Sequence, residues 1–156
     1  MENIELVNFS DEDIKIFKQW INKDYIKKWY GNLDDWIDEV TNRNGEFNFI
    51  KHFIVKNNGQ KIGFCQYYDC YDAQEAWYKI NKAKEIYSID YLIGEEEYLN
   101  KGYGKIIIKK LIEKIKTEGG REIIVQPELE NKASNGILIA NGFLYNKEKE
   151  YYYLRI

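Results

Sequence analysis

The sequence predicts an α/β fold built on a mixed sheet, and three observations support this. Segments that alternate apolar and polar residues are interspersed with segments whose apolar residues recur every three or four positions, which are the periods of strands and helices. The expected order along the chain is β-α-α-β-β-β-α-β-α-β-β. The 156 residues include one proline and no repeat or Gly/Ser linker. We therefore expect a single domain over residues 1–156.

In the N-terminal part, apolar and polar residues alternate over residues 2–9, which predicts the first strand. Ser10 and Asp13 resemble a capping box that opens a helix. The apolar face of that helix is expected to consist of Ile14, Phe17, Trp20 and Ile21. Asn32 is placed to cap a second helix. Its apolar face is expected to consist of Leu33, Trp36, Ile37 and Val40.

The middle of the chain predicts three strands. Residues 47–56 and 61–68 read as a hairpin joined by the tight turn Asn57-Asn58-Gly59. A polar and aromatic excursion follows over residues 69–84, too long for a simple hairpin loop, and such loops are often functional. A further strand is expected at residues 85–93.

The C-terminal part predicts a helix at residues 102–118, a strand at 121–126, a helix at 131–141 and short strands at 143–145 and 151–156. The residues expected to turn inward from the first of these helices are Ile106, Ile107, Leu111 and Ile115.

The composition argues against several classes of protein. The net charge of −3 gives no overall excess of basic residues with which to bind nucleic acid. No segment approaches the 18 consecutive apolar residues of a membrane-spanning helix. Cys65, Cys70 and His52 fall short of the four ligands of a structural zinc site, so we expect no metal. Reduced thiols and an N-terminus without the features of a signal peptide indicate a soluble, cytoplasmic protein.

A glycine-containing turn runs directly into the helix expected from residue 102. Backbone amides at a helix start are unsatisfied and the helix dipole adds positive charge, so a pyrophosphate binds well there. The residues of this turn are Asn100, Lys101, Gly102, Tyr103, Gly104 and Lys105. The pattern matches neither of the common phosphate-binding glycine motifs, and by itself a plain turn explains it.

The strand before this turn carries an unusual residue. Tyr87, Ile89, Tyr91 and Ile93 share one face of the expected strand, and Ser88, Asp90 and Leu92 share the other. Aspartate is depleted in strand interiors. Asp90 is therefore a candidate for a carboxylate that lines a cleft and accepts a proton from an attacking amine. The alternative is an edge strand on which Asp90 faces solvent.

Together, the strand, the acidic turn, the segment N-K-G-Y-G-K and the helix resemble the acetyl-CoA-binding core of GCN5-related N-acetyltransferases. Residues 126–143, Q-P-E-L-E-N-K-A-S-N-G-I-L-I-A-N-G-F, resemble the last motif of that superfamily, with Asn131, Ser134, Gly142 and Phe143 at its marked positions. More narrowly, Trp29-Tyr30-Gly31, residues 62–68 and residues 88–94 resemble aminoglycoside 6′-N-acetyltransferases, in family order.

The resemblance implies a mostly antiparallel central sheet of about six to seven strands flanked by helices, with acetyl-CoA as co-substrate and no metal. It implies that Asp90 orients or deprotonates the substrate amine. The backbone of Leu92, Ile93 and Gly94 would bind pantetheine like an added strand, and residues 100–105 would hold the pyrophosphate. Further cofactor contacts are expected from Asn131 and Ser134, and further contacts to the acceptor from Trp29 and Tyr30. Gln66 and Asp69 are also expected to contact the acceptor, because they lie beside the excursion.

There are two departures from the family pattern. Leu99 stands where the superfamily often has Gln or Arg, although the aminoglycoside branch tolerates this. Leu138 stands where the family usually has the tyrosine that protonates the leaving thiolate. Another group or water would then serve, or the thiolate would leave unprotonated, a modest penalty for a thiol with a pKa near ~8.5. A third reading is a protein that binds CoA without rapid catalysis.

Acidic and aromatic residues bear on the choice of acceptor. Aromatic residues make up 16% of the chain and suit a wet ligand cleft, although core packing and codon usage explain them equally well. Acidic residues that could attract a polycation, or that simply form solvated surface, are Asp34, Asp35, Asp38, Glu39, Asp69, Asp72 and Glu95 to Glu97. His52 shares a strand face with Ile50 and Ile54, which favours a packed histidine over a catalytic base.

The favoured function is therefore acetyl transfer from acetyl-CoA to a primary amine, most of all the 6′-amine of an aminoglycoside. Other small-molecule or protein amines are a second reading, and a CoA-binding module without catalysis is a third, because one fold hosts many functions. The sequence leaves monomer and homodimer equally open.

Overall fold

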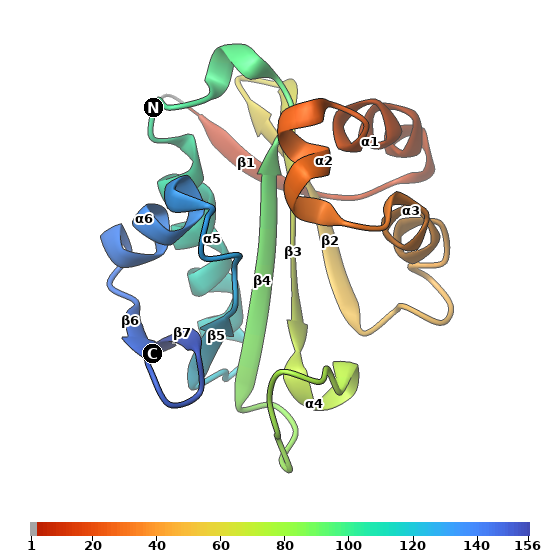
Figure 1. Ribbon diagram of the computed structural model, residues 1–156. Helices are drawn as coiled ribbons and strands as arrows, with labels where there is room; N and C mark the ends of the chain where they lie inside the picture. The colour runs from red at the N-terminus through yellow and green to blue at the C-terminus, as the bar shows by residue number, and fades with distance from the viewer. Residues whose placement is uncertain (1–2) are drawn as a thin grey trace.

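A computed structural model describes residues 3–156 and shows one seven-stranded sheet with helices on both of its faces (Figure 1). The strands lie in the order β1-β2-β3-β4-β5-β7-β6, and every neighbouring pair is antiparallel except β4 and β5. The mixed, mostly antiparallel sheet is confirmed. Glu2, part of the predicted first strand, lies outside the described residues.

The strands are β1 (Ile4–Asn8), β2 (Ile50–Asn57), β3 (Gln60–Asp69), β4 (Ile86–Ile93), β5 (Glu122–Val125), β6 (Leu144–Asn146) and β7 (Tyr151–Arg155). The helices are η1 (Asp11–Asp13), α1 (Ile14–Ile21), α2 (Asp24–Tyr30), α3 (Leu33–Thr41), α4 (Cys70–Ala73), η2 (Glu96–Tyr98), α5 (Tyr103–Thr117) and α6 (Lys132–Ala140).

Two segments differ from the sequence-based expectation. The chain breaks after α1 and forms a separate helix, α2, which the sequence reading treated as a connection. Residues 47–49 form successive turns instead of extending β2, because the amides of Phe47 and Ile50 are already bonded to the nearby carbonyls of Asn42 and Phe47.

The two faces of the sheet carry separate cores. Alternate residues of the central strands, such as Phe53, Cys65 and Ile89, pack against the inward face of α5. Their neighbours Ile54, Phe64 and Leu92 point the other way and pack beneath α1, α2 and α3. Period-two alternation thus puts α5 and α6 on one side of the sheet and α1 to α3 on the other (Figure 1).

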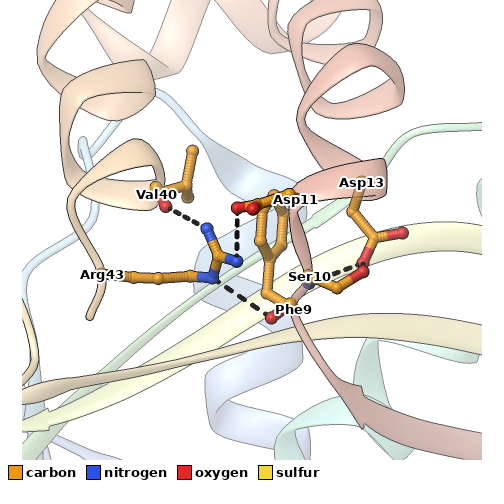
Figure 2. Close-up of polar contacts among 6 residues, drawn as sticks. All are labelled: Phe9, Ser10, Asp11, Asp13, Val40 and Arg43. Atoms are coloured by element: carbon orange, nitrogen blue, oxygen red, sulfur yellow. Dashed lines mark hydrogen bonds and ion pairs between the residues drawn. The ribbon is translucent and has the colours of Figure 1, made fainter.

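The N-terminal helices are fixed to the sheet by one buried guanidinium group (Figure 2). Arg43, just after α3, donates to the carbonyls of Phe9 and Val40 at 3.2 and 2.8 Å and to the Asp11 carboxylate at 2.8 Å. Beside it, the Asp13 carboxylate accepts from the amide and hydroxyl of Ser10 at 2.9 and 3.0 Å, which confirms the predicted capping box. These contacts hold α1 and α3 against the end of β1.

The two central strands β4 and β5 separate soon after they meet. Their parallel pairing covers only Ile86 with Glu122 and Tyr87 with Ile123. From Ser88 to Ile93, β4 keeps its partner β3, and within residues 3–156 no strand pairs with its other edge. The sheet is therefore split at its centre, beside the acidic residue at position 90.

Gly94, directly after β4, lies against the indole ring of Trp20, where an added Cβ would come within 2.1–2.3 Å of ring carbons. We expect Gly94→Ala to destabilise the fold by about 1–3 kcal/mol or more, because the fully buried Trp20 has no space to retreat. Chemical denaturation would measure the loss. Gly45→Ala is the matched control, since its Cβ would meet only the Asn42 carbonyl oxygen, at 3.8 Å, and equal losses in both variants would contradict the packing described.

Candidate active site

A cavity of about 770 Å³ passes through the split in the sheet. Its wall includes Ser88 and Asp90 from one face of β4 and Ile89 and Tyr91 from the other. It also includes residues of α2 and α3 on one side of the sheet and of α5 and α6 on the opposite side. Two molecules entering from opposite faces would therefore meet at β4.

One end of the cavity lies at the start of α5, in the segment predicted to bind pyrophosphate. Gly102 caps this helix in the left-handed region, with φ of 86°, a conformation that glycine adopts without strain. The predicted residues that line the cavity here are Asn100, Gly102, Tyr103, Gly104 and Lys105. Lys101 is exposed and does not line it, so Lys105 rather than Lys101 brings positive charge to this end.

The start of α6 closes the same end. The Asn131 side chain caps α6 by accepting a hydrogen bond from the Ser134 amide at 3.1 Å, and both residues line the cavity. Leu138 lies one turn further along, where the resemblance implies a tyrosine. It is 1% exposed and packs in the core with α5 while bordering the cavity. The wall is apolar at this position.

The unpaired edge of β4 was predicted to bind pantetheine through residues 92–94, and the strand register changes that prediction. The Gly94 amide donates to the Ile62 carbonyl at 2.7 Å. Along an antiparallel strand, the N–H and C=O groups of one residue point to the same side, and successive residues alternate. The N–H and C=O groups of Leu92 and Gly94 therefore face β3, and those of Tyr91 and Ile93 face the open edge. Gly94 also does not line the cavity, whereas Leu92 contributes its side chain to the wall.

Two tyrosines of α2 already contact this open edge. The Tyr25 hydroxyl donates to the Ile93 carbonyl at 2.8 Å, and the Tyr30 hydroxyl donates to the Tyr91 carbonyl. The amides of Tyr91 and Ile93 are thus the donors on this edge that an added strand would use. Burial, with the nearby Asp90 carboxylate as a second cause, raises the pKa of Tyr30 well above its ordinary value, so this phenol stays neutral.

Asp90 lies on β4 between the two ends of the cavity and is partly buried. The Gln66 side chain, directly opposite on β3, donates to its Oδ2 atom at 2.9 Å. Loss of solvent raises the pKa of Asp90 to about 7; the Gln66 hydrogen bond opposes this rise and the Glu75 charge adds to it. A carboxylate with this pKa is poised to accept a proton near neutral pH.

The other end of the cavity is acidic and aromatic. Glu39 of α3 and Glu75 of the excursion line it together with Asp90. Loss of solvent and then the charges of Asp90 and Glu75 raise the pKa of Glu39 to about 7, as expected for carboxylates that repel one another. The aromatic side chains lining this end are Tyr25, Trp29, Tyr30, Trp36, Phe47, Phe49, Tyr68 and Trp77.

The structure separates the two predicted acceptor contacts next to the excursion. Gln66 is 2% exposed, lines the cavity and holds Asp90. Asp69 does not line the cavity, because its carboxylate accepts from the amides of Tyr71 and Lys84 at 3.0 and 2.7 Å. Asp69 thereby starts α4 and closes the base of the excursion, and its contact with the acceptor stays a prediction.

The excursion supplies site residues that sequence reasoning missed. The loop after α4 turns back and brings Glu75 and Trp77 to the cavity, held in part by the Tyr78 hydroxyl, which donates to the Cys70 carbonyl at 2.8 Å. Trp36 and Glu39 share one face of α3 at a spacing of three residues. That spacing could have singled out Glu39 from the other acidic residues of the chain.

Residues 3–156 contain neither a cluster of metal ligands nor a membrane-spanning helix. No group of three His, Cys, Asp or Glu side chains in this part of the chain gathers closely enough to hold a metal ion. None of its helices combines the length and the apolar character that crossing a bilayer requires.

Comparisons with known proteins bear on this cavity. The sequence matches the acetyltransferase (GNAT) domain family over residues 10–151. It is similar to aminoglycoside N(6′)-acetyltransferase type 1 from Klebsiella pneumoniae and from Serratia marcescens, at 22% identity over 118 residues in each case. These matches cover 72% of this chain and 59% of each relative, so less than two thirds of the relatives' length is represented.

Solved structures agree on the fold. Aminoglycoside acetyltransferase AAC(6′)-Ib in complex with coenzyme A has a TM-score of 0.83 at 18% identity, covering 98% of this chain and 95% of that one. An aminoglycoside N(6′)-acetyltransferase from Legionella pneumophila has a TM-score of 0.75 at 13% identity, covering 100% and 92%. Identities this low establish a shared fold alone. Since the family match extends over nearly the whole sequence, the chain belongs to the acetyltransferase (GNAT) domain family.

Proposed function

We propose that this domain transfers the acetyl group of acetyl-CoA to a primary amine of a cationic small molecule, and that an aminoglycoside 6′-amine is the acceptor. The observation that carries the proposal is the cavity through the split sheet. It joins the start of α5, which is suited to a phosphate, to an acidic, aromatic end, with Asp90 between them. The names of the relatives, which include aminoglycoside 6′-N-acetyltransferases, support the same acceptor.

The donor end fits acetyl-CoA in three respects. The start of α5 offers outward amides and the positive end of a helix dipole to a pyrophosphate, and Lys105 adds a charge. The amides of Tyr91 and Ile93 lie on the unpaired edge of β4, where an extended amide chain can add as a strand. Acetyl-CoA would supply an activated thioester at this edge.

The acceptor end prepares the amine for attack. At neutral pH an alkylamine arrives protonated, and the carboxylates of Asp90, Glu39 and Glu75 favour the cation. Asp90 accepts a proton from the bound ammonium, directly or through water, which frees the nitrogen lone pair. The nitrogen then bonds to the acetyl carbon as the bond from that carbon to sulfur breaks. The sulfur leaves as the CoA thiolate, and the second proton that the nitrogen must lose passes to water or to that thiolate. An amide on the edge of β4 stabilises the charge that develops on the carbonyl oxygen.

A second candidate is a domain that binds CoA without rapid catalysis. Leu138 favours it, because this buried side chain cannot protonate the departing thiolate. A thiol pKa near ~8.5 nevertheless allows the thiolate to leave as the anion at modest cost. For this reason we place acetyl transfer first.

Thiol release from acetyl-CoA across a panel of amines tests the proposal. We expect turnover with a kanamycin-type aminoglycoside that carries a 6′-amine, and none with an otherwise matched aminoglycoside that carries a 6′-hydroxyl. Mass spectrometry should locate a single added acetyl group on the 6′ nitrogen.

Other results of the same panel would contradict specific parts of the proposal. Turnover confined to a polyamine or to a peptide amine would overturn the aminoglycoside acceptor and keep the reaction. A CoA-dependent rise in Tm without turnover on any amine would favour the second candidate.

A further inference from the structure

Three polar residues lie side by side across the sheet. His52 on β2 pairs directly with Gln66 on β3, and Gln66 pairs directly with Asp90 on β4. Directly paired residues of antiparallel strands point to the same face. The three side chains therefore form a polar row beneath α1 to α3, next to the apolar row of Ile54 and Phe64.

Within residues 3–156, the side chains of the row form one hydrogen bond with each other and leave two buried polar atoms without a hydrogen-bond partner. Gln66 donates through Nε2 to Asp90 at 2.9 Å. Within residues 3–156, the buried Oε1 atom of Gln66 and the buried Nε2 atom of His52 have no hydrogen-bond partner. Gln66 is 2% exposed and His52 is 6% exposed. Native proteins seldom leave such atoms unsatisfied, because the loss of solvation is not compensated.

The two atoms are chemically complementary and belong to side chains at directly paired positions. The amide oxygen of Gln66 is an acceptor, and Nε2 of a neutral histidine is a donor in one tautomer. Side chains at directly paired positions have Cβ atoms roughly 4.5–5.5 Å apart. A small change in side-chain torsion, or one bridging water, joins the imidazole to the amide. Burial, and secondarily the Arg43 charge, lowers the pKa of His52 to about 4, which keeps the ring neutral.

We propose that His52 is a positioning residue for Asp90 and acts through Gln66. An amide group can turn by 180° and present either its oxygen or its nitrogen to the carboxylate. A hydrogen bond from His52 to Oε1 retains the orientation in which the NH₂ group faces Asp90. Strands β2 and β4 are about 10 Å apart, so the imidazole does not reach the carboxylate itself. The inference rests on the proposed role of Asp90 in acetyl transfer.

The orientation of Gln66 matters because it stabilises the charged form of Asp90. The Gln66 hydrogen bond lowers the pKa of Asp90, whereas burial and Glu75 raise it. Other ionisable groups also face the row, and a substitution of His52 leaves all of them in the protein. They are Arg43 after α3, Glu39 on α3, Tyr30 on α2, Tyr68 on β3, and Cys70 and Glu75 in and after α4.

The variants His52→Phe and Gln66→Leu, alone and combined, test the row. ¹³C NMR of the Asp90 carboxyl, assigned through Asp90→Asn, should show that Gln66→Leu raises the pKa of Asp90 by about one pH unit or more, the loss of a hydrogen bond to a charged group. His52→Phe should raise it less, in the same direction. In the Gln66→Leu background, His52→Phe should have no further effect, because its route to Asp90 is gone. The acid limb of the pH profile of kcat/KM should move in parallel.

Two further variants separate positioning from packing. His52→Gln keeps a donor and should restore most of the wild-type titration. Ile54→Val, on the same face of β2, should lower Tm and leave the titration of Asp90 where it is. An unchanged Asp90 pKa in His52→Phe, or an equal further shift in the double variant, overturns the inference. If the wild-type protein acetylates no amine, the proposed function fails, while the NMR titration still decides whether His52 acts on Asp90.

Discussion

Asp90→Asn is expected to lower turnover by about 100-fold or more, the usual size of a general-base contribution, while CoA still binds. Asparagine keeps the shape of the side chain and removes both the charge and the proton acceptor. The measurement is kcat with the best amine of the panel, together with the CoA-dependent shift in Tm. An anchoring role for the carboxylate would also raise KM for a cationic amine.

The pH dependence gives an independent check on the same residue. Because the pKa of Asp90 is about 7 in the protein without ligand, kcat/KM of the wild type should fall as pH drops below about 7. Glu39 titrates in the same range, so the limb reports the coupled pair. In Asp90→Asn that limb should be weakened. An Asp90→Asn variant with wild-type turnover and an unchanged profile would remove Asp90 from the chemistry.

Stability should move in the direction opposite to activity. The folded-state pKa of Asp90 lies above its ordinary value of 3.8, so the native state carries an unfavourable charged carboxylate above pH 7. This cost disappears as pH falls from about 7 towards 4, where the native state binds a proton that the unfolded state does not. Asp90→Asn should therefore match or exceed the wild-type Tm at pH 8, whereas a structural aspartate would give a loss.

Gly104→Val is expected to abolish the stabilisation of the protein by CoA. A Cβ at this position would come within 2.9 Å of Ile137 Cδ1 and 3.2 Å of Tyr91 Cε2, and the larger valine would displace these cavity walls at the start of α5. In the wild type, CoA at 100 times its Kd should add about 2.7 kcal/mol, or roughly 5–10 °C in Tm for a chain of this size. The variant should show little or none of that shift.

Gly136→Val is the matched control for this experiment. Gly136 lies on the exposed side of α6, and an added Cβ would have nothing within 4 Å. It should retain the full CoA-dependent shift. Since overpacking can lower the Tm of Gly104→Val without ligand, each shift is taken relative to the same variant without CoA. A wild-type shift in Gly104→Val would mean that the phosphates bind elsewhere.

The regular elements were largely predictable because their signals are local. The capping box at Ser10, the turn at Asn58 and Gly59, and the apolar face of α5 each follow from a few neighbouring residues. The sequence reading failed where local hydrogen bonds compete with an apolar pattern. Residues 47–49 have the composition of a strand, yet the amides of Phe47 and Asn48 are bonded within turns, and no sequence period reveals that competition.

The candidate site was predictable only in part, for a similar reason. Asp90 stood out because an aspartate within an apolar strand is rare, and its neighbour Gln66 was named for its position beside the excursion. Glu75 was missed because nothing in the sequence distinguishes it from acidic residues on the surface, and Glu39 was named only as one member of a large acidic set, although its spacing from Trp36 on α3 could have set it apart. Whether the N–H and C=O groups of residues 91–94 face β3 or the open edge depends on the pairing register with β3. The register is set by two strands together, so the sequence of one strand does not reveal it.

The split between β4 and β5 divides the molecule into two parts that can change independently. Residues of α3, the turns before β2 and the loop after α4 line the acceptor end, whereas residues of α5 and α6 line the donor end. Helix α2 belongs to both, because its Tyr25 and Tyr30 line the acceptor end and also donate to the open edge of β4. Substitutions in the first group can alter the size or charge of the accepted amine without touching the donor end. A lineage built on this architecture can therefore acquire a new acceptor while its affinity for acetyl-CoA is unaffected.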